Sequence, residues 1–120
     1  MAKKILLVDD DRDLVFIVRE ALLKQGYEVL SAPEGAQALR IIKEQQVDLM
    51  IVDLTMPGMN GWKFTMKARQ EPNYKSTPII VISGLLDRDS TAESFEGATL
   101  YLVKPFDIIK LLARIKAFLA

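Results

Sequence analysis

Short apolar runs alternate along the whole chain with segments of helical periodicity. Four of the runs are continuous, which is typical of parallel strands that are buried on both faces. A further run, Tyr27–Ala32, is more polar, so we expect it nearer an edge of the sheet. The predicted strands are Ile5–Val8, Tyr27–Ala32, Leu49–Val52, Ile79–Ile82 and Leu100–Val103.

Each predicted strand is followed by a segment with apolar residues at helical spacing. Gly26 ends the first helix at a position where a left-handed residue is favoured. The segment Asp87–Glu96 is the weakest helix, because serine and threonine are indifferent helix formers. Five strands alternating with five helices predict an α/β fold, a doubly wound parallel sheet with helices on both faces. We expect one domain over residues 1–120.

Composition narrows the chemistry that this domain can perform. Sixteen basic residues balance sixteen acidic ones, so there is no overall basic field for nucleic acid. The chain has no cysteine and no histidine, which excludes disulfides, thiolate or imidazole metal sites and Ser-His-Asp triads. The first apolar run stops at Asp9 and no stretch is as long as a membrane span. We therefore expect a cytoplasmic protein with no membrane partner.

Polar residues follow four of the predicted strands at the point where each strand ends. In a parallel sheet these ends lie at one edge, where ligands bind in open α/β folds. The first and third strands supply carboxylates, the fourth a hydroxyl and the fifth an ammonium group. The residues are Asp9, Asp10, Asp11, Asp53, Ser83 and Lys104.

Clustered carboxylates repel one another and raise each other's pKa, so such a cluster usually serves a cation. Oxygen-only ligands with high negative charge suit a hard ion, and Mg²⁺ fits best, with Mn²⁺ as the alternative. A bound ion would neutralise an incoming phosphoryl group, whose other oxygens Lys104 and Ser83 could contact. Asp53 could then attack phosphorus in line and form an aspartyl-phosphate.

Four sequence motifs resemble the receiver domain of bacterial response regulators, in the same order and over essentially the whole chain. They are ILLVDDD at Ile5–Asp11, DLTMPGMNG at Asp53–Gly61, IIVISG at Ile79–Gly84 and YLVKPF at Tyr101–Phe106. The resemblance implies a flavodoxin-like fold with strand order 2-1-3-4-5. It also implies a phosphorylation-activated signalling switch of a two-component system rather than an enzyme that acts on a free substrate.

The resemblance assigns roles to individual residues. Asp53 would accept the phosphoryl group from the phosphohistidine of a sensor histidine kinase or a phosphotransfer protein. Asp9, Asp10, Asp53 and the backbone carbonyl of Thr55 would hold Mg²⁺. Lys104 would pair with the phosphoryl group, and the Lys104–Pro105 peptide bond would be cis.

The resemblance also implies how phosphorylation is read out. Ser83 would swing toward the phosphoryl oxygens, and Tyr101 would turn inward in response. The surface of the fourth helix, fifth strand and fifth helix would then change and control an unknown downstream target. A half-buried strand aromatic is the alternative interpretation of Tyr101. The domain would not itself bind nucleic acid.

Two positions that often tune hydrolysis of the aspartyl-phosphate in this family hold Thr55 and Leu85. Leu85 has no polar group to orient a water molecule, so we predict slow autodephosphorylation. The acidic residues that many relatives place before the tyrosine are replaced here at positions 98–100. The oligomeric state stays open between a monomer and a phosphorylation-dependent dimer.

Alternative interpretations exist for single residues and for the whole chain. Asp11 and Asp13 could cap or flank the first helix, or Asp11 could contact the metal. A magnesium-dependent phosphatase would usually carry an acid/base Asp where Thr55 stands. A flavodoxin-like cofactor binder would need a phosphate-cradling first loop, which Asp9–Asp11 does not provide. A degenerate receiver would have no reason to keep the acidic residues together with Lys104.

Overall fold

A computed structural model of the chain describes residues 2–54, 61–84 and 97–120. The predicted helix Asp87–Glu96 and the positions of Thr55 and Leu85 lie outside these ranges. Among the described residues no helix is both long and apolar enough to cross a bilayer.

The strands and helices alternate as the apolar pattern predicts. The strands are β1 (Lys4–Val8), β2 (Glu28–Ala32), β3 (Leu49–Asp53), β4 (Ile79–Ser83) and β5 (Leu100–Val103). The helices are α1 (Arg12–Lys24), α2 (Gly35–Glu44), α3 (Gly61–Gln70) and α4 (Ile108–Leu119), with a short 3-10 helix, η1, at Pro72–Tyr74. The label α4 thus denotes the C-terminal helix.

All strand pairs are parallel, and the order in the sheet is β2-β1-β3-β4-β5. This confirms the predicted doubly wound sheet and its flavodoxin-like order. β2, the most polar strand in the sequence, lies at one edge as expected. β3 lies in the centre, so its carboxyl end is flanked by the ends of β1 and β4.

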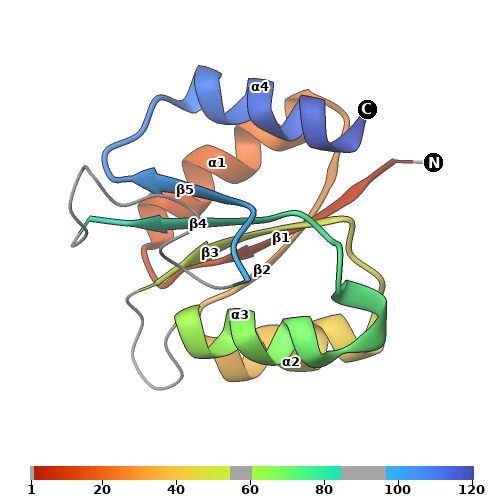
Figure 1. Cartoon of the computed structure of the whole chain (residues 1–120). Helices are drawn as coiled ribbons and strands as arrows, with labels where there is room; N and C mark the ends of the chain where they lie inside the picture. Colours follow the sequence, from red (N-terminus) through yellow and green to blue (C-terminus); the bar gives the residue numbers. More distant parts are fainter. Residues whose placement is uncertain (1, 55–60, 85–96) are drawn as a thin grey trace.

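The helices cover both faces of the sheet in two layers. Figure 1 shows α1 and α4 on one face and α2 and α3 on the other. β1 supplies both layers, because Leu6 and Val8 join the core beneath α2 and α3 while Ile5 and Leu7 join the core beneath α1 and α4. This two-sided burial explains why the strand sequence is continuously apolar.

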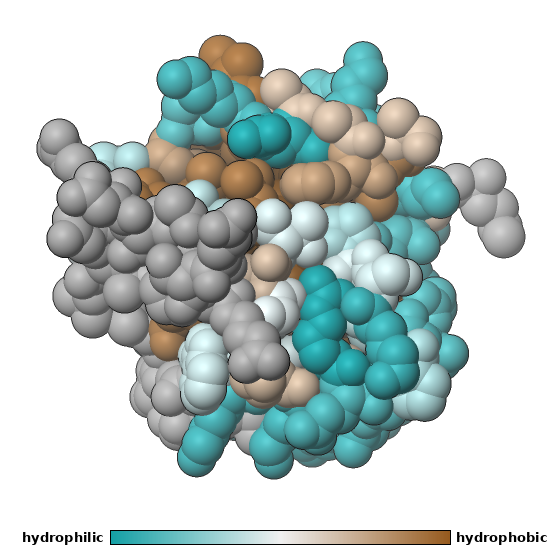
Figure 2. Space-filling model, viewed as in Figure 1, coloured by the Kyte–Doolittle hydropathy of each residue, from teal (hydrophilic) through white to brown (hydrophobic). Residues whose placement is uncertain are grey.

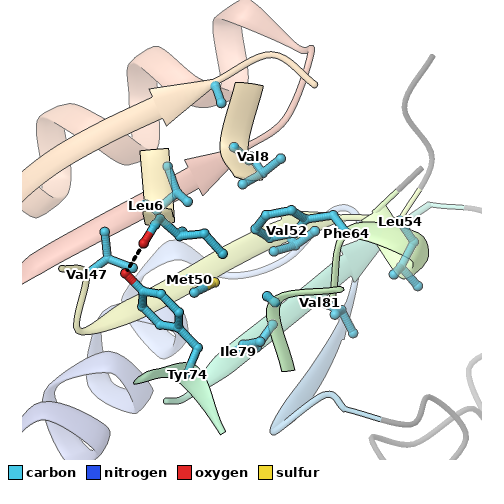
Figure 3. Packing of buried hydrophobic residues seen from close by; sticks show 14 of the residues in the cluster. Leu6, Val8, Val47, Met50, Val52, Leu54, Phe64, Tyr74, Ile79 and Val81 are labelled. Carbon is cyan, nitrogen blue, oxygen red and sulfur yellow. Dashed lines mark hydrogen bonds between the residues drawn. The ribbon is translucent and has the colours of Figure 1, made fainter. Parts of the chain in front are cut away.

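The core beneath α2 and α3 also contains the aromatic side chains of Phe64 and Tyr74, which are labelled in Figure 3. The Tyr74 hydroxyl lies 2.7 Å from the backbone carbonyl oxygens of both Ile42 and Gln45, which share its single donated proton. A buried hydroxyl needs such partners, because desolvation without a hydrogen bond is costly. Tyr74 therefore fastens η1 to the end of α2.

The ends of α1 follow the sequence signals. Asp11 is the N-cap residue, and its carboxylate accepts from the backbone N–H groups of Asp13 and Leu14, both at 3.1 Å. After the helix, Gly26 has a φ of 90°, a left-handed conformation that favours glycine. The capping interpretation of Asp11 is thereby confirmed.

Arg69 ties the start of β5 to α3 and β4. Its guanidinium donates to the backbone carbonyls of Gly97, Tyr74 and Thr77 at 2.9, 2.7 and 2.6 Å. It also donates to the Thr99 hydroxyl at 3.2 Å, and the same hydroxyl accepts from the Ile79 N–H at 3.0 Å. These contacts fix where the edge strand β5 begins, and β5 carries Tyr101 and leads to Lys104.

Candidate functional site

The polar residues singled out in the sequence meet at the carboxyl edge of the sheet. Asp53 is the last residue of β3, Ser83 is the last residue of β4, and Asp9 and Lys104 directly follow β1 and β5. The Asp9 N–H donates to the carbonyl of Ala32 at 3.1 Å, which holds this residue at the end of β1. The strands therefore set the spacing of the site.

Three carboxylates form a tight cluster at this edge. One oxygen from each of Asp9, Asp10 and Asp53 lies within 4.8 Å of the other two. Asp9 and Asp53 are buried, with 6% and 2% of their surface exposed, whereas Asp10 is open to solvent. Two ligand oxygens on opposite sides of a Mg²⁺ ion lie about 4.2 Å apart, so a small closure would let the cluster share one hard cation. The donor set fits such an ion.

Lys104 bridges the two buried carboxylates. Its Nζ lies 3.2 Å from Asp9 Oδ2 and 3.5 Å from Asp53 Oδ2. The Lys104 N–H donates to the Ser83 carbonyl at 3.0 Å, which extends the pairing of β5 with β4 to this residue. The Lys104–Pro105 peptide bond is cis, as the resemblance implied. One ammonium group thus faces the side of the cluster formed by β1 and β3.

The charges at the site shift one another's pKa. Burial raises the pKa of Asp9, and the nearby Asp53 carboxylate adds to this. The Asp11 N–H, which donates to Asp9 Oδ1 at 2.9 Å, and Lys104 act in the opposite direction without reversing the shift. Burial alone would lower the pKa of Lys104, but Asp9 and Asp53 outweigh it, so this pKa is raised. The Lys104 ammonium group therefore stays protonated. The raised pKa of Asp9 means that its ionised carboxylate is less stable in this site than in water.

Gly61 has a role that the sequence did not reveal. It begins α3, and a Cβ at this position would overlap the backbone carbonyl of Asp53 and crowd the backbone of Leu54. The Gly61 N–H also donates to the Leu54 carbonyl at 3.2 Å. Only glycine permits this approach. The start of α3 is therefore held directly against the backbone of the candidate nucleophile.

Ser83 and Tyr101 occupy neighbouring strands near the cluster. Ser83 is fully buried and is opposite Val103 in the register of β4 and β5. Tyr101 is opposite Val81, is 8% exposed, and belongs to the core beneath α2 and α3. The Tyr101 side chain is thus buried in the core in this structure. Its coupling to Ser83 stays a prediction. Thr55 and Leu85 lie outside the described residues.

Comparison with known proteins identifies the class to which this fold and site belong. The chain belongs to the response regulator receiver domain family, whose model matches residues 5–116. A phosphorylation switch in two-component signalling is the role of this family. The cluster of Asp9, Asp10 and Asp53 next to Lys104 thus occurs in a domain type built around phosphoryl acceptance.

Individual relatives agree with this assignment. The chain is 41% identical over 119 residues to the transcriptional regulatory protein CpxR of Escherichia coli K12, covering 97% of this chain and 49% of CpxR. It therefore spans about half the length of the curated relatives that it matches. The chemotaxis protein CheY4 of Vibrio cholerae has a similar structure, with a TM-score of 0.89, 32% identity and coverage of 98% and 99% of the two chains. The response regulator TrrA of Thermotoga maritima, solved in complex with Mg²⁺-BeF, has a TM-score of 0.84, 31% identity and coverage of 97% and 98%.

Proposed function

We propose that this domain accepts a phosphoryl group on Asp53 from the phosphohistidine of a sensor histidine kinase or a phosphotransfer protein. An Asp53 carboxylate oxygen attacks phosphorus, the phosphorus–nitrogen bond breaks, and its electron pair returns to the imidazole of the donor. The central observation is the position of Asp53, which ends the central strand within 4.8 Å of two further carboxylates and 3.5 Å from Lys104. We place this reaction in the cytoplasm.

Asp9, Asp10 and Asp53, with the backbone carbonyl of Thr55, would hold Mg²⁺ or Mn²⁺. The bound ion supplies positive charge that offsets the phosphoryl oxygens and the carboxylates in the transition state. The support in this chain is the oxygen-only donor set. The relative TrrA carries Mg²⁺-BeF, which resembles a metal-bound phosphoryl group.

Lys104 would move from its two carboxylate partners to a phosphoryl oxygen, since the raised pKa keeps its ammonium protonated. The hydroxyl of Ser83 would contact a second phosphoryl oxygen, because this residue ends the strand next to Asp53. In this way the domain assists its own phosphorylation by positioning and charge neutralisation. Hydrolysis would be slow, because Leu85 offers no group to orient water.

Phosphorylation would be read out through Ser83 and Tyr101. Ser83 lies on β4 and Tyr101 lies on the adjacent strand β5. The Lys104 N–H donates to the Ser83 carbonyl, which links the ends of the two strands. A shift of Ser83 toward the phosphoryl group would therefore also displace β5. We infer that the surface formed by residues 87–96, β5 and α4 changes and controls the downstream target.

Incubation with phosphoramidate and Mg²⁺, followed by intact mass measurement, tests this function. Wild type should gain the mass of one phosphoryl group, and Asp53→Ala should gain none. Asp13→Asn, which removes an exposed carboxylate outside the cluster, should react as wild type does. A Mg²⁺-dependent adduct that persists in Asp53→Ala would refute the assignment of the acceptor.

A further inference from the structure

The outer face of α1 exposes an unusual amount of apolar surface. Phe16, Ile17 and Leu23 are 64%, 57% and 42% exposed. They make up three of the five large apolar side chains that are exposed within the described ranges. Figure 2 shows that, in its view of the molecule, hydrophobic atoms gather in the upper half, where α4 lies, and hydrophilic atoms dominate over α2 and α3. Among the described helices, α1 thus carries the most exposed large apolar side chains.

Charged residues flank Phe16 on α1 with opposite signs on opposite sides. Phe16 and Leu23 are seven residues apart, so they lie almost in line along the helix. Arg12 and Arg19 line a cavity on the β2 side of Phe16, together with Ser31 and Pro33. Glu20 lines a groove on the other side, toward α4, which also contains Lys24 and Leu112.

Asp13 belongs to the same side as Glu20, because it is also seven residues from it. Within the described residues, none of the side chains of Arg12, Asp13, Arg19 and Glu20 forms an ion pair. The outer face of α1 is thus an apolar line between a basic flank and a flank that is acidic at Asp13 and Glu20 and ends in Lys24.

We propose that this face is a self-association surface, on which α1 packs parallel to α1 of a second copy of the chain. A two-fold axis parallel to the helices places the basic flank of each copy against the acidic flank of the other. Arg12 then faces Asp13 of the second copy, and Arg19 faces Glu20 of the second copy. Symmetry repeats both ion pairs, and the Phe16 and Leu23 side chains meet their own copies between them.

The charge pattern favours this arrangement over an antiparallel one. A two-fold axis perpendicular to the helices keeps each flank on its own side, so Arg12 would face Arg19 of the second copy. Like charges in that position are unfavourable. The parallel contact combines exposed ion pairs with a narrow apolar line, so the dimer is weak and weakens further with salt. The contacts of Phe16, Arg19, Glu20 and Leu23 do not depend on phosphorylation, because these side chains are not part of the carboxylate cluster, whereas Arg12 lines a cavity together with Asp9 and Asp10.

Single cysteines give a direct test, because the chain contains none. In the parallel dimer Leu23 lies opposite Leu23 of the second copy, so L23C should form a disulfide-linked dimer when treated with diamide at low salt. R40C provides the control, because Arg40 is exposed on α2, on the opposite face of the sheet. A rate for L23C no faster than for R40C would overturn the proposal.

Charge reversals then test the pairing of the flanks. In the L23C background, R19E and E20R should each slow cross-linking, on the order of tenfold, because each turns two attractions into two repulsions. An equimolar mixture of the two reversed chains at the same total concentration should recover to about half the original rate, because about half of the random pairs are heterodimers, in which the attractions return. R40E in the same background should have no effect. Cross-linking of R19E that is as fast as that of the L23C parent, or faster, would contradict the proposal.

Sedimentation equilibrium of the unmodified chain gives an independent readout. Wild type should show a monomer–dimer equilibrium up to about 1 mM at low salt that shifts toward monomer in high salt. F16S should be monomeric over the same range while it keeps the circular dichroism spectrum of wild type. A wild-type chain that stays monomeric throughout would overturn the proposal.

Discussion

The acidic cluster predicts that neutralising Asp9 stabilises the domain when no divalent cation is bound. Asp9 is 6% exposed, and burial of a carboxylate to this extent costs several kcal/mol. At an effective dielectric constant of about 20, repulsion from Asp53 at up to 4.8 Å adds about 3.5 kcal/mol. Attraction to Lys104 at 3.2 Å returns about 5 kcal/mol, and the Asp11 N–H about 2 kcal/mol.

The unfavourable contributions slightly exceed the favourable ones, in agreement with the raised pKa of Asp9. Asp9→Asn keeps the shape of the side chain and an oxygen for the Asp11 N–H. Lys104 retains Asp53 as a partner at 3.5 Å. We therefore expect Asp9→Asn without divalent cations to raise the free energy of unfolding by about 1 kcal/mol, or the melting temperature by about 4 °C.

Thermal unfolding with and without Mg²⁺ is the assay. Wild type should gain about 1.4 kcal/mol at a Mg²⁺ concentration ten times its dissociation constant, and Asp9→Asn should gain much less at that concentration. Asp13→Asn, which changes an exposed carboxylate, is the matched control and should shift neither curve appreciably. A lower melting temperature of Asp9→Asn without Mg²⁺, with the control unchanged, would refute the electrostatic reasoning.

Three further predictions concern Lys104, Gly61 and Leu85. Lys104→Met should lower the free energy of unfolding by about 2 kcal/mol at pH 7, because it leaves buried carboxylates without their counter-charge. The pKa of Lys104 is raised above 10.5 in the folded state, so the stability difference between wild type and Lys104→Met should persist below pH 10.5 and disappear as the pH rises through the folded-state pKa. Melting curves in alkaline buffers measure this difference. A difference that stays constant with pH would contradict the prediction. Gly61→Ala should destabilise the domain by about 3 kcal/mol in urea unfolding and slow phosphorylation, because its Cβ overlaps the Asp53 carbonyl; a wild-type midpoint and rate would show that the approach is not required. The aspartyl-phosphate of wild type should last much longer than seconds, and that of Leu85→Asn should hydrolyse about tenfold faster than that of wild type. Intact mass over time measures both rates. Equal rates would show that Leu85 is not the cause of slow hydrolysis.

The sequence predicted most of the fold because the strands are short and buried on both faces. A run such as Leu49–Val52 has no polar position that could face water, so it indicates a central strand, which β3 is. The chain order of strands and helices then limits the topology. The convergence of Asp9, Asp53 and Lys104 was also predictable, since all parallel strands end at the same edge.

Other features could not be predicted, because they depend on contacts with backbone groups whose positions are set by how the elements pack. Nothing in the sequence distinguishes Arg69 from the other arginines. Its guanidinium nevertheless donates a hydrogen bond to the backbone carbonyl of Gly97, 28 residues away. Gly61 looked like an ordinary residue at a helix start, and its approach to Asp53 depends on how α3 packs. Neither contact can be recognised from the types of residue that surround it in the sequence.

Asp53 is one of three clustered carboxylates, and it is the one that we propose carries the phosphoryl group. Because the oxygens of Asp9, Asp10 and Asp53 lie within 4.8 Å of one another, loss of phosphorylation on substitution alone does not distinguish acceptor from metal ligand. Borohydride reduction of the phosphorylated chain, followed by peptide mass mapping, marks the residue that held the acyl phosphate. We expect the label on Asp53 alone, and a label on Asp9 or Asp10 would contradict the assignment of the acceptor.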